Sequence, residues 1–314
     1  MDFAEPKSRA VAHAMQGSTI TMANFRADRF ATLYFFRPIR SIVSGDGNWR
    51  IPILMYHSIG ETEGEGRHPY FRTETSPLAF ETHIKYLHDN RYTVISPEDV
   101  VGLLGSGRVD TKKYAVVTFD DGYRDFYTNA FPILDKYRMS ATVYLPTAYI
   151  QSHSHLFKGK ECMTWDEVRE MHAAGIKFGS HTVSHPQLEL LSDADLRREI
   201  RTSKDAIEAE LGTPVRSFAY PYAFPEQNHK FTGRLRDLLE ESGYENGVST
   251  IVGSTHSLED KFFLKRLPAN SCDDTAFLEA KLLGDYDWLH AAQYFYKKLA
   301  RPAANGKTTS VGAQ

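Results

Sequence analysis

The regular alternation of short apolar runs with longer amphipathic segments constrains the fold of this chain most strongly. Apolar runs rich in Val, Ile, Tyr and Phe predict strands, and the segments between them show the apolar spacing of helices. Strands that alternate with helices at short spacing indicate parallel βαβ units. We expect strands at residues 51–57, 92–96, 114–119, 141–146, 176–180, 216–220 and 244–249.

Helices are predicted in most of the connections, and Thr164 with Glu167 predicts a capping box at the start of one of them. About seven βα units suit an irregular barrel better than an open sheet. We therefore predict an α/β fold with a distorted (β/α) barrel of about seven parallel strands, whose chemistry lies at the carboxyl ends of the strands. The predicted helices cover residues 76–90, 97–107, 131–138, 164–175, 192–212, 231–243 and 273–284.

Composition excludes several classes of protein. The 314 residues are 41% hydrophobic, which is enough for one large domain. A net charge of -3 gives no electrostatic reason to expect a nucleic acid partner. The two cysteines, Cys162 and Cys272, lie far apart, so neither a disulfide framework nor a thiolate zinc site is indicated.

The two ends of the chain differ from the middle, and we divide it into an extension at 1–49, a catalytic domain at 50–300 and a disordered tail at 301–314. The N-terminal stretch has no apolar core, so it does not predict a secretory signal. Residues 30–40 combine aromatic side chains with arginines. This segment is predicted to pack on the domain or on a partner within a biosynthetic complex, and the alternative is a peripheral anchor on an acidic membrane.

Polar groups follow three of the predicted strands. Asp120 and Asp121 directly follow the strand at 114–119, His181 and His185 follow the strand at 176–180, and His57 ends the first strand. Because a barrel gathers the carboxyl ends of its strands at one rim, these side chains are expected to lie together.

Two histidines and one carboxylate make a three-ligand set with an open position, as in catalytic zinc sites. Pro186 disfavours helical geometry at His185, so the histidine pair is placed on a strand-to-loop turn. Asp121 would bind the cation, and the neighbouring Asp120 would remain ionised as a general base. Either motif alone is weak evidence for a metal site, since surface histidines and Asp-Asp-Gly turns are common. Their joint occurrence at strand ends is much less likely to be accidental.

The segments "TFDDGY", "SHTVSH" and "FAYPYA" resemble the first three motifs of the polysaccharide deacetylases, the NodB-homology or carbohydrate esterase family 4 enzymes, and the resemblance covers residues 51–266. It implies a NodB-like barrel that removes N- or O-acetyl groups from sugars, usually N-acetylglucosamine polymers or peptidoglycan. It also implies one divalent metal ion, most commonly Zn²⁺, with Co²⁺ or Ni²⁺ as alternatives. The positions that match the family motifs are Asp120 as base, Asp121, His181 and His185 as metal ligands, and Pro221 and Tyr222 as the segment that holds the oxyanion.

The general acid is less directly indicated. The common family order places it on a histidine near the C-terminus, where His290 lacks the expected motif. The strand end at His57 is similar to the permuted order of the bacterial poly-N-acetylglucosamine deacetylases, so His57 is predicted to be the acid. The alternative is a buried structural histidine beside Tyr56.

Two positions depart from the family pattern. Ala219 stands where an arginine often pairs with the base, and Ala223 replaces the usual glycine. Arg266, placed after a later strand, is predicted to supply the missing cation, with a surface arginine as the alternative.

The loop that carries His153, His155 and Cys162 allows a second metal site, but neutral loop residues are the preferred interpretation, since a fourth ligand at suitable spacing is missing.

The sequence thus predicts a metal-dependent deacetylase acting on an acetylated amino-sugar saccharide. The alternatives are an O-acetyl esterase or small-amide hydrolase with the same site, or an inactive carbohydrate-binding relative. Family members mostly act outside the cytoplasm. Without a readable export signal, the expected location here is the cytoplasm or the cytoplasmic face of a membrane.

Overall fold

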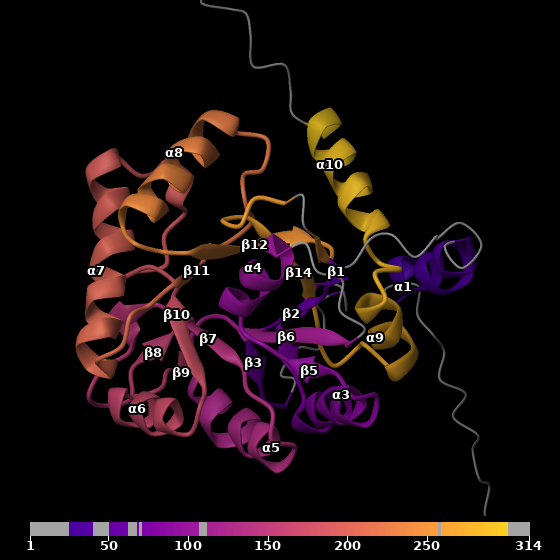
Figure 1. Ribbon diagram of the computed structural model, residues 1–314, viewed down its shortest axis with the longest axis horizontal. Coiled ribbons are helices and arrows are strands. Elements are labelled where there is room, and N and C mark those ends of the chain that lie inside the picture. The colour runs from indigo at the N-terminus through magenta and orange to yellow at the C-terminus, as the bar shows by residue number, and fades with distance from the viewer. Residues whose placement is uncertain are drawn as a thin grey trace, which may run out of the picture.

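The structure is a computed structural model that describes residues 25–39, 50–61, 68, 71–106, 112–256 and 259–300. Within these residues, seven parallel strands close into a barrel, because β2 pairs with β14 on one side and with β6 on the other (Figure 1). This confirms the predicted α/β barrel. In order around the barrel the strands are β2 (Ile53–Tyr56), β6 (Tyr114–Phe119), β7 (Thr142–Leu145), β10 (Lys177–Ser180), β11 (Ser217–Ala219), β12 (Asn246–Val252) and β14 (Leu264–Pro268).

Helices surround the barrel (Figure 1). Ser76 caps α3 by accepting a hydrogen bond from the Ala79 N–H, and Thr164 forms the predicted capping box with Glu167 at the start of α6. The main helices are α3 (Pro77–Asp89), α4 (Pro97–Gly105), α5 (Phe131–Lys136), α6 (Trp165–Ala173), α7 (Asp193–Leu211), α8 (His229–Glu241), α9 (Thr275–Leu282) and α10 (Trp288–Ala300). Short helical turns are η4 (Phe126–Ala130), η5 (Thr147–Tyr149) and η6 (Leu188–Leu190).

The barrel is distorted, as the sequence predicts. β5 (Thr93–Val94) pairs with the first half of β6 outside the ring of seven, and β7 pairs with the second half. β10 and β11 share the register pair Ser180 and Phe218, and the register between β12 and β14 shifts along their length. The remaining short strands are β1 (Arg50–Ile51) with β13 (Thr255–His256), β3 (Ser58–Ile59) with β4 (Glu74–Thr75), and the hairpin of β8 (Leu156–Phe157) and β9 (Lys160–Glu161).

Alternate residues of the strands belong to two separate apolar clusters. Val116 and Leu264 pack with Val100 of α4 in the smaller cluster, which also contains Tyr144 and Val248. The intervening Val117 and Phe119 join the large cluster that includes apolar residues of the surrounding helices. Because side chains alternate along a strand, the face that carries Val116 and Leu264 continues to Thr118, Asp120 and Arg266.

Arg266 lies within β14, whereas the sequence analysis placed it after a strand. It is fully buried, so the alternative of a surface arginine is wrong.

Part of the predicted N-terminal extension forms α1 (Ala27–Ala31) and η2 (Thr32–Phe36), which pack beside α9. Thr32 is buried and accepts a hydrogen bond of 3.0 Å from Trp288 Nε1, and Phe36 stacks on Trp288 with 4.5 Å between ring centroids. The rest of the predicted extension, residues 1–24 and 40–49, and the predicted tail at 301–314 lie outside the described residues.

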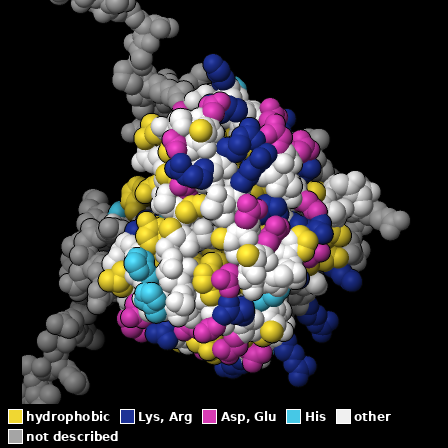
Figure 2. Space-filling model, turned by 90° about the vertical axis from the view of Figure 1, so that its left-hand side faces the viewer, with side chains coloured by type: hydrophobic (Ala, Val, Ile, Leu, Met, Phe, Trp, Pro, Cys, Tyr) yellow, Lys and Arg dark blue, Asp and Glu magenta, His cyan; other side chains and the backbone are white. Residues whose placement is uncertain are grey.

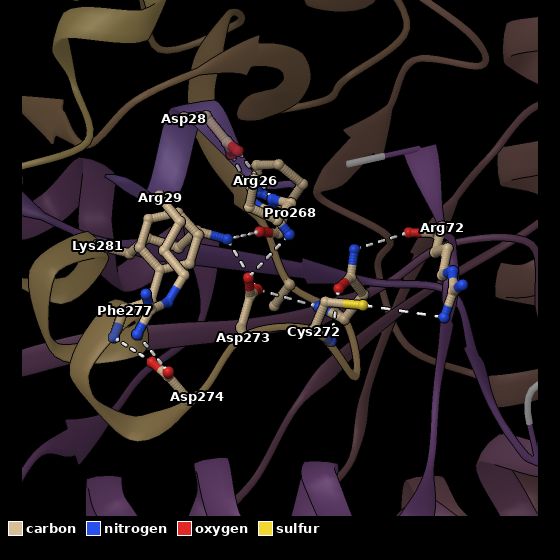
Figure 3. A network of polar contacts seen from close by, with 12 residues as sticks. Arg26, Asp28, Arg29, Arg72, Pro268, Cys272, Asp273, Asp274, Phe277 and Lys281 are labelled. Carbon is tan, nitrogen blue, oxygen red and sulfur yellow. Dashed lines mark hydrogen bonds and ion pairs between the residues drawn. The ribbon is translucent and has the colours of Figure 1, made fainter. Parts of the chain in front are cut away.

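The arginines of this segment are paired within the fold. Arg26 contacts Asp28 at 2.6 Å and Asp273 at 3.5 Å, as Figure 3 shows from close by. Arg29 contacts Asp274 at 2.5 Å, and Arg37 contacts Glu279 at 2.8 Å. These pairs weaken the electrostatic argument for an acidic membrane. The aromatic side chains of Phe30, Tyr34 and Phe35 remain exposed.

Basic and acidic side chains are interspersed on the face shown in Figure 2, which includes the surface of α7. Arg197 of α7 contacts Glu241 at 2.9 Å, and Arg234 of α8 contacts Asp193 at 2.5 Å. This face therefore presents no continuous basic stripe of the kind that binds nucleic acid. Among the helices of the described residues, none has the length and hydropathy that crossing a bilayer requires.

Lys281 of α9 is a buried cation that contacts Asp273, and Asp273 in turn contacts Arg26 of the N-terminal segment. Its ammonium donates to the Pro268 carbonyl at 2.6 Å and to Asp273 Oδ2 at 2.7 Å, at the end of β14 (Figure 3). Burial lowers the pKa of Lys281 despite the attraction of Asp273. The fold must therefore keep an ammonium and a carboxylate paired away from water.

We expect Lys281→Met to lower the free energy of unfolding by about 3–5 kcal/mol, because it leaves the buried Asp273 carboxylate without its closest cation. Urea denaturation of the full chain measures this. The matched control is Lys85→Met, which removes an exposed ion pair with Asp89 on α3 and should cost under about 1 kcal/mol. Equal effects of the two substitutions would contradict a stabilising role for the buried pair.

Candidate active site

The turn after β6 explains the Asp-Asp-Gly sequence. Asp121 has φ 71° and Gly122 has φ 61°, so the chain leaves the strand through left-handed backbone. A Cβ at Gly122 would lie 3.1 Å from Ile150 and 3.2 Å from Leu145. Asp120 and Asp121 are almost fully buried, with 2% and 4% exposure. The glycine therefore allows a tight turn that keeps both carboxylates inside the protein.

The histidine pair lies on a loop after β10, as predicted, and not on a helix. His185 has φ 56°, and its N–H donates to Thr182 Oγ1 at 3.0 Å. Glu199 of α7 accepts hydrogen bonds of 2.9 Å from the N–H groups of Val183 and Ser184. Glu199 thus fixes the loop that carries both histidines, a role that sequence reasoning missed because nothing in the helical pattern of α7 distinguishes it from surface acids.

Asp121, His181 and His185 converge on one point. Asp121 Oδ1 lies 3.6 Å from His181 Nε2 and 3.2 Å from His185 Nε2, and one ligand atom from each residue lies within 4.8 Å of the others. Oδ1 is buried and has no hydrogen-bond partner among the described residues. His181 Nδ1 donates to the Ala219 carbonyl at 2.8 Å, which leaves Nε2 as the lone-pair atom facing Asp121. These residues fit a divalent metal ion.

The charge states also suit metal ligands. Burial, together with the neighbouring His185, lowers the pKa of His181 to about 4, although Asp120 and Asp121 oppose the shift. Burial alone would raise the pKa of Asp121. Contact with His185 and the nearby His57 and His181 more than offset this effect, so the pKa falls well below its usual range and the carboxyl stays ionised. A neutral imidazole and a carboxylate are the forms that bind a metal.

Asp120 is paired with Arg266 in a two-pronged contact. Two guanidinium nitrogens of Arg266 each lie 2.7 Å from one carboxylate oxygen, and Arg266 Nε donates to the Ser249 carbonyl at 2.9 Å. Burial alone would raise the pKa of Asp120, but Arg266, with His181 and His57, brings it below its usual range. Arg266 thus supplies the cation that Ala219 lacks.

The structure also brings His57 and the segment at Pro221 and Tyr222 to this end of the barrel. His57 directly follows β2 and lies close enough to both aspartates to lower their pKa values. Tyr222 has φ 60°, its ring lies 4.7 Å from that of His185, and its N–H donates to none of the described residues. Thr250 holds this loop by donating to the Tyr222 carbonyl at 3.1 Å and accepting from the Phe224 N–H at 2.8 Å.

The other sequence candidates do not join the ligand group, although the Cys162 thiol lies 3.9 Å from the Asp121 carbonyl. His290 of α10 contacts Glu226 at 2.6 Å. His153 and His155 are exposed, Cys162 is buried, and none of them joins the metal-ligand group found among the described residues. Lys158, in contrast, was missed. Its ammonium lies 3.4 Å from Asp121 Oδ2, and the short apolar runs around "FKGK" gave little sign of the hairpin that carries it.

Comparison with known proteins identifies a family and relatives to which this chain is similar. Residues 107–247 match the family model of the polysaccharide deacetylases. Protein YxkH of Bacillus subtilis (strain 168), whose name places it among the polysaccharide deacetylases, is 29% identical over 69% of this chain and 71% of its own length. The poly-beta-1,6-N-acetyl-D-glucosamine N-deacetylase of Staphylococcus aureus is 23% identical over 68% of this chain and 77% of its own length.

A solved structure shares the fold. The deacetylase PplD of Streptococcus pyogenes, determined in complex with acetate, superposes with a TM-score of 0.65 and 28% identity. The match covers 75% of this chain and 99% of that chain. The barrel is therefore a fold found in a solved deacetylase structure.

We expect the chain to bind one divalent metal ion, and we expect His185→Gln to weaken binding by more than about 100-fold, since even partners of metal ligands contribute up to this factor. Calorimetric titration of the chelator-treated chain with Zn²⁺ measures both the stoichiometry and the affinity. The control is His155→Gln, which removes an exposed loop histidine and should leave the affinity unchanged. Binding that is equally strong in all three chains would exclude His185 as a ligand.

Proposed function

We propose that this chain, of which residues 107–247 match the polysaccharide deacetylase model, is a member of that family and removes N-acetyl groups from an N-acetylglucosamine-type poly- or oligosaccharide in a metal-dependent reaction. The observation that carries this proposal is the division of labour between two neighbouring buried carboxylates. Asp120 pairs with Arg266, and Asp121 faces two histidines. The name of the Staphylococcus aureus relative supports the substrate class.

Asp121, His181 and His185 would hold the metal ion, with Zn²⁺ as the first choice and Co²⁺ or Ni²⁺ as alternatives. Histidine nitrogens with one carboxylate oxygen are typical ligands of catalytic zinc, and the set leaves a coordination position open. When bound, such an ion supplies Lewis acidity toward the acetyl carbonyl and lowers the pKa of water.

Asp120 would act as the general base. The Arg266 guanidinium holds the pKa of the Asp120 carboxyl below its usual range, so the carboxylate is ionised and can accept a proton from the attacking water. Its position next to Asp121 places the base beside the metal ligands. The water oxygen then forms a bond to the acetyl carbon.

His57 would act as the general acid. Breaking the carbon–nitrogen bond requires a proton on the leaving amine, and protonated His57 would donate it, so the products are acetate and a free amino sugar. The Tyr222 N–H, which donates to none of the described residues, would donate to the oxyanion of the tetrahedral intermediate.

The same residues would also serve an O-acetyl esterase or a small-amide hydrolase, and a carbohydrate-binding relative without activity would keep the fold. The buried and paired Asp120 argues against loss of activity, because an unused buried ion pair seldom adds stability. Acetylated sugars remain the proposed substrates, and measurements of acetate release distinguish hydrolysis of an N-acetyl amide from hydrolysis of an O-acetyl ester.

We further propose that the protein acts in the cytoplasm or at the cytoplasmic face of a membrane, with α1 and η2 touching the bilayer or a biosynthetic complex. The exposed rings of Phe30, Tyr34 and Phe35 support such a contact, and the unpaired cysteines are typical of a reducing compartment.

We expect the full chain to float with both zwitterionic and anionic vesicles, and we expect Tyr34→Ser with Phe35→Ser to reduce the bound fraction at least about threefold, since two large apolar groups would no longer be buried. The double substitution of Leu78 and Leu190 by Ser removes other exposed apolar groups and should have no effect. Absence of the parent chain from the vesicle fraction would exclude the membrane and leave the protein partner.

Acetate release tests the proposed activity. We expect the metal-loaded chain to release acetate from N-acetylglucosamine oligomers, and we expect Asp120→Asn to reduce this at least about 100-fold without loss of metal, because the base is removed. Asp135→Asn, which changes an exposed carboxylate of α5, should behave as the parent.

His57→Gln separates the acid from other roles. It should reduce amide hydrolysis much more than hydrolysis of 4-nitrophenyl acetate, because a phenolate leaves without protonation. Release from O-acetylated sugars alone would favour the esterase, and a metal-loaded parent that releases acetate from no substrate would contradict the proposal.

A further inference from the structure

The hairpin of β8 and β9 brings the positively charged side chain of Lys158 to the proposed metal ligands. Lys158 Nζ lies 3.4 Å from Asp121 Oδ2 and 3.5 Å from His185 Nε2. The family motifs quoted above do not include this residue, and the proposed reaction does not use it. Its ammonium nevertheless contacts two of the three residues that would bind the metal, Asp121 and His185.

The hairpin is anchored on both sides of its tip. Phe157 is buried, and its ring lies 4.3 Å from Tyr149 and 5.2 Å from His185. On the other strand, Lys160 donates to Ser58 Oγ at 2.7 Å and contacts Glu74 at 3.2 Å. The two anchors fix the backbone of the tip beside the ligand group, so Lys158 reaches Asp121 because of where the hairpin is held.

The turn at the tip is unusual for its sequence. Lys158 has φ 51° and Gly159 has φ 81°, so both residues of the two-residue turn are left-handed, as in a type I′ turn. Asn, Asp or Gly usually occupies the first of these positions, because other side chains are strained there. A lysine kept at a strained position near a site points to a role for its side chain.

The ammonium and a metal ion would need the same lone pair. An imidazole that binds a metal offers one nitrogen lone pair, and the Lys158 ammonium lies 3.5 Å from His185 Nε2, the nitrogen that also lies 3.2 Å from Asp121 Oδ1. Two cations that share one carboxylate at this distance also repel each other. Lys158 is 41% exposed, so its side chain can turn toward solvent without movement of the hairpin backbone.

We propose that Lys158 competes with the divalent metal ion for Asp121 and His185, and that binding of the metal moves the ammonium away from the ligands to the mouth of the site. In its present position the ammonium also lies 4.6 Å from the Phe157 ring and 5.5 Å from the Tyr222 ring, and by the mouth of the site we mean the solvent side of these two rings. Lys158 therefore sets the metal affinity of this chain and is a positioning residue. The inference rests on the proposed metal-binding role of the ligand group.

Metal affinity tests the competition directly. Lys158→Asn removes the cation and creates the Asn-Gly sequence that favours this turn, so the variant should fold. We expect its dissociation constant for Zn²⁺ to fall roughly three- to tenfold, in line with the loss of one partly exposed competing ion pair. Lys158→Arg keeps the charge, and Lys230→Met removes an exposed lysine of α8 far from the hairpin in sequence. Both should bind Zn²⁺ as the parent does.

Side-chain reactivity gives a second readout that does not depend on a substitution. Because coupling between two binding events is reciprocal, Zn²⁺ must displace the ammonium if the ammonium weakens Zn²⁺ binding. We expect amine labelling followed by mass spectrometry to show faster modification of Lys158 when Zn²⁺ is added, with Lys160 unchanged.

Equal or weaker Zn²⁺ binding by Lys158→Asn would overturn the proposal, as would labelling of Lys158 that does not respond to Zn²⁺. These failures would leave the proposed deacetylase activity intact. A parent chain that binds no divalent metal would instead contradict the metal site itself, and the competition with it.

Discussion

The buried contact between Arg266 and Asp120 is the interaction on which the candidate site depends. It joins the strand β14 to the end of β6 through two hydrogen bonds of 2.7 Å, in a place where both side chains are almost fully buried. A lone carboxylate there would take up a proton, and a lone guanidinium would be costly to bury. The pair therefore keeps Asp120 ionised, and it frees Asp121 to face the histidines.

Much of this arrangement was predictable from the sequence, because strand ends in a barrel converge. The apolar run at 114–119 placed Asp120 and Asp121 at the rim, and Pro186 kept His185 off a helix. The position of Arg266 within a strand was harder to predict, since the strand is short and its register decides which side chains face the barrel interior. Glu199 and Lys158 could not be found, because each acts through tertiary contacts made by elements distant in sequence.

The N-terminal segment shows a similar limit. Its aromatic residues and arginines predicted a contact surface, but the arginines pair with acids of the loop before α9 and of α9 itself. That loop begins at the end of β14, so α1 and the strand that carries Arg266 are connected through Asp273 and Lys281. The segment thus contributes to the fold at the carboxyl end of β14, and its exposed aromatic side chains remain for a partner or a membrane.

The pH dependence of acetate release tests most directly whether Arg266 keeps Asp120 ready to accept a proton. A base must be ionised to act, so activity falls as the pH drops through its pKa. In the metal-saturated chain, the acidic limb of kcat/KM should move to higher pH by about one unit in Arg266→Lys, because the single ammonium replaces the two-pronged guanidinium contact. Metal content is measured at each pH. An acidic limb that stays in place while the metal is retained would contradict the account.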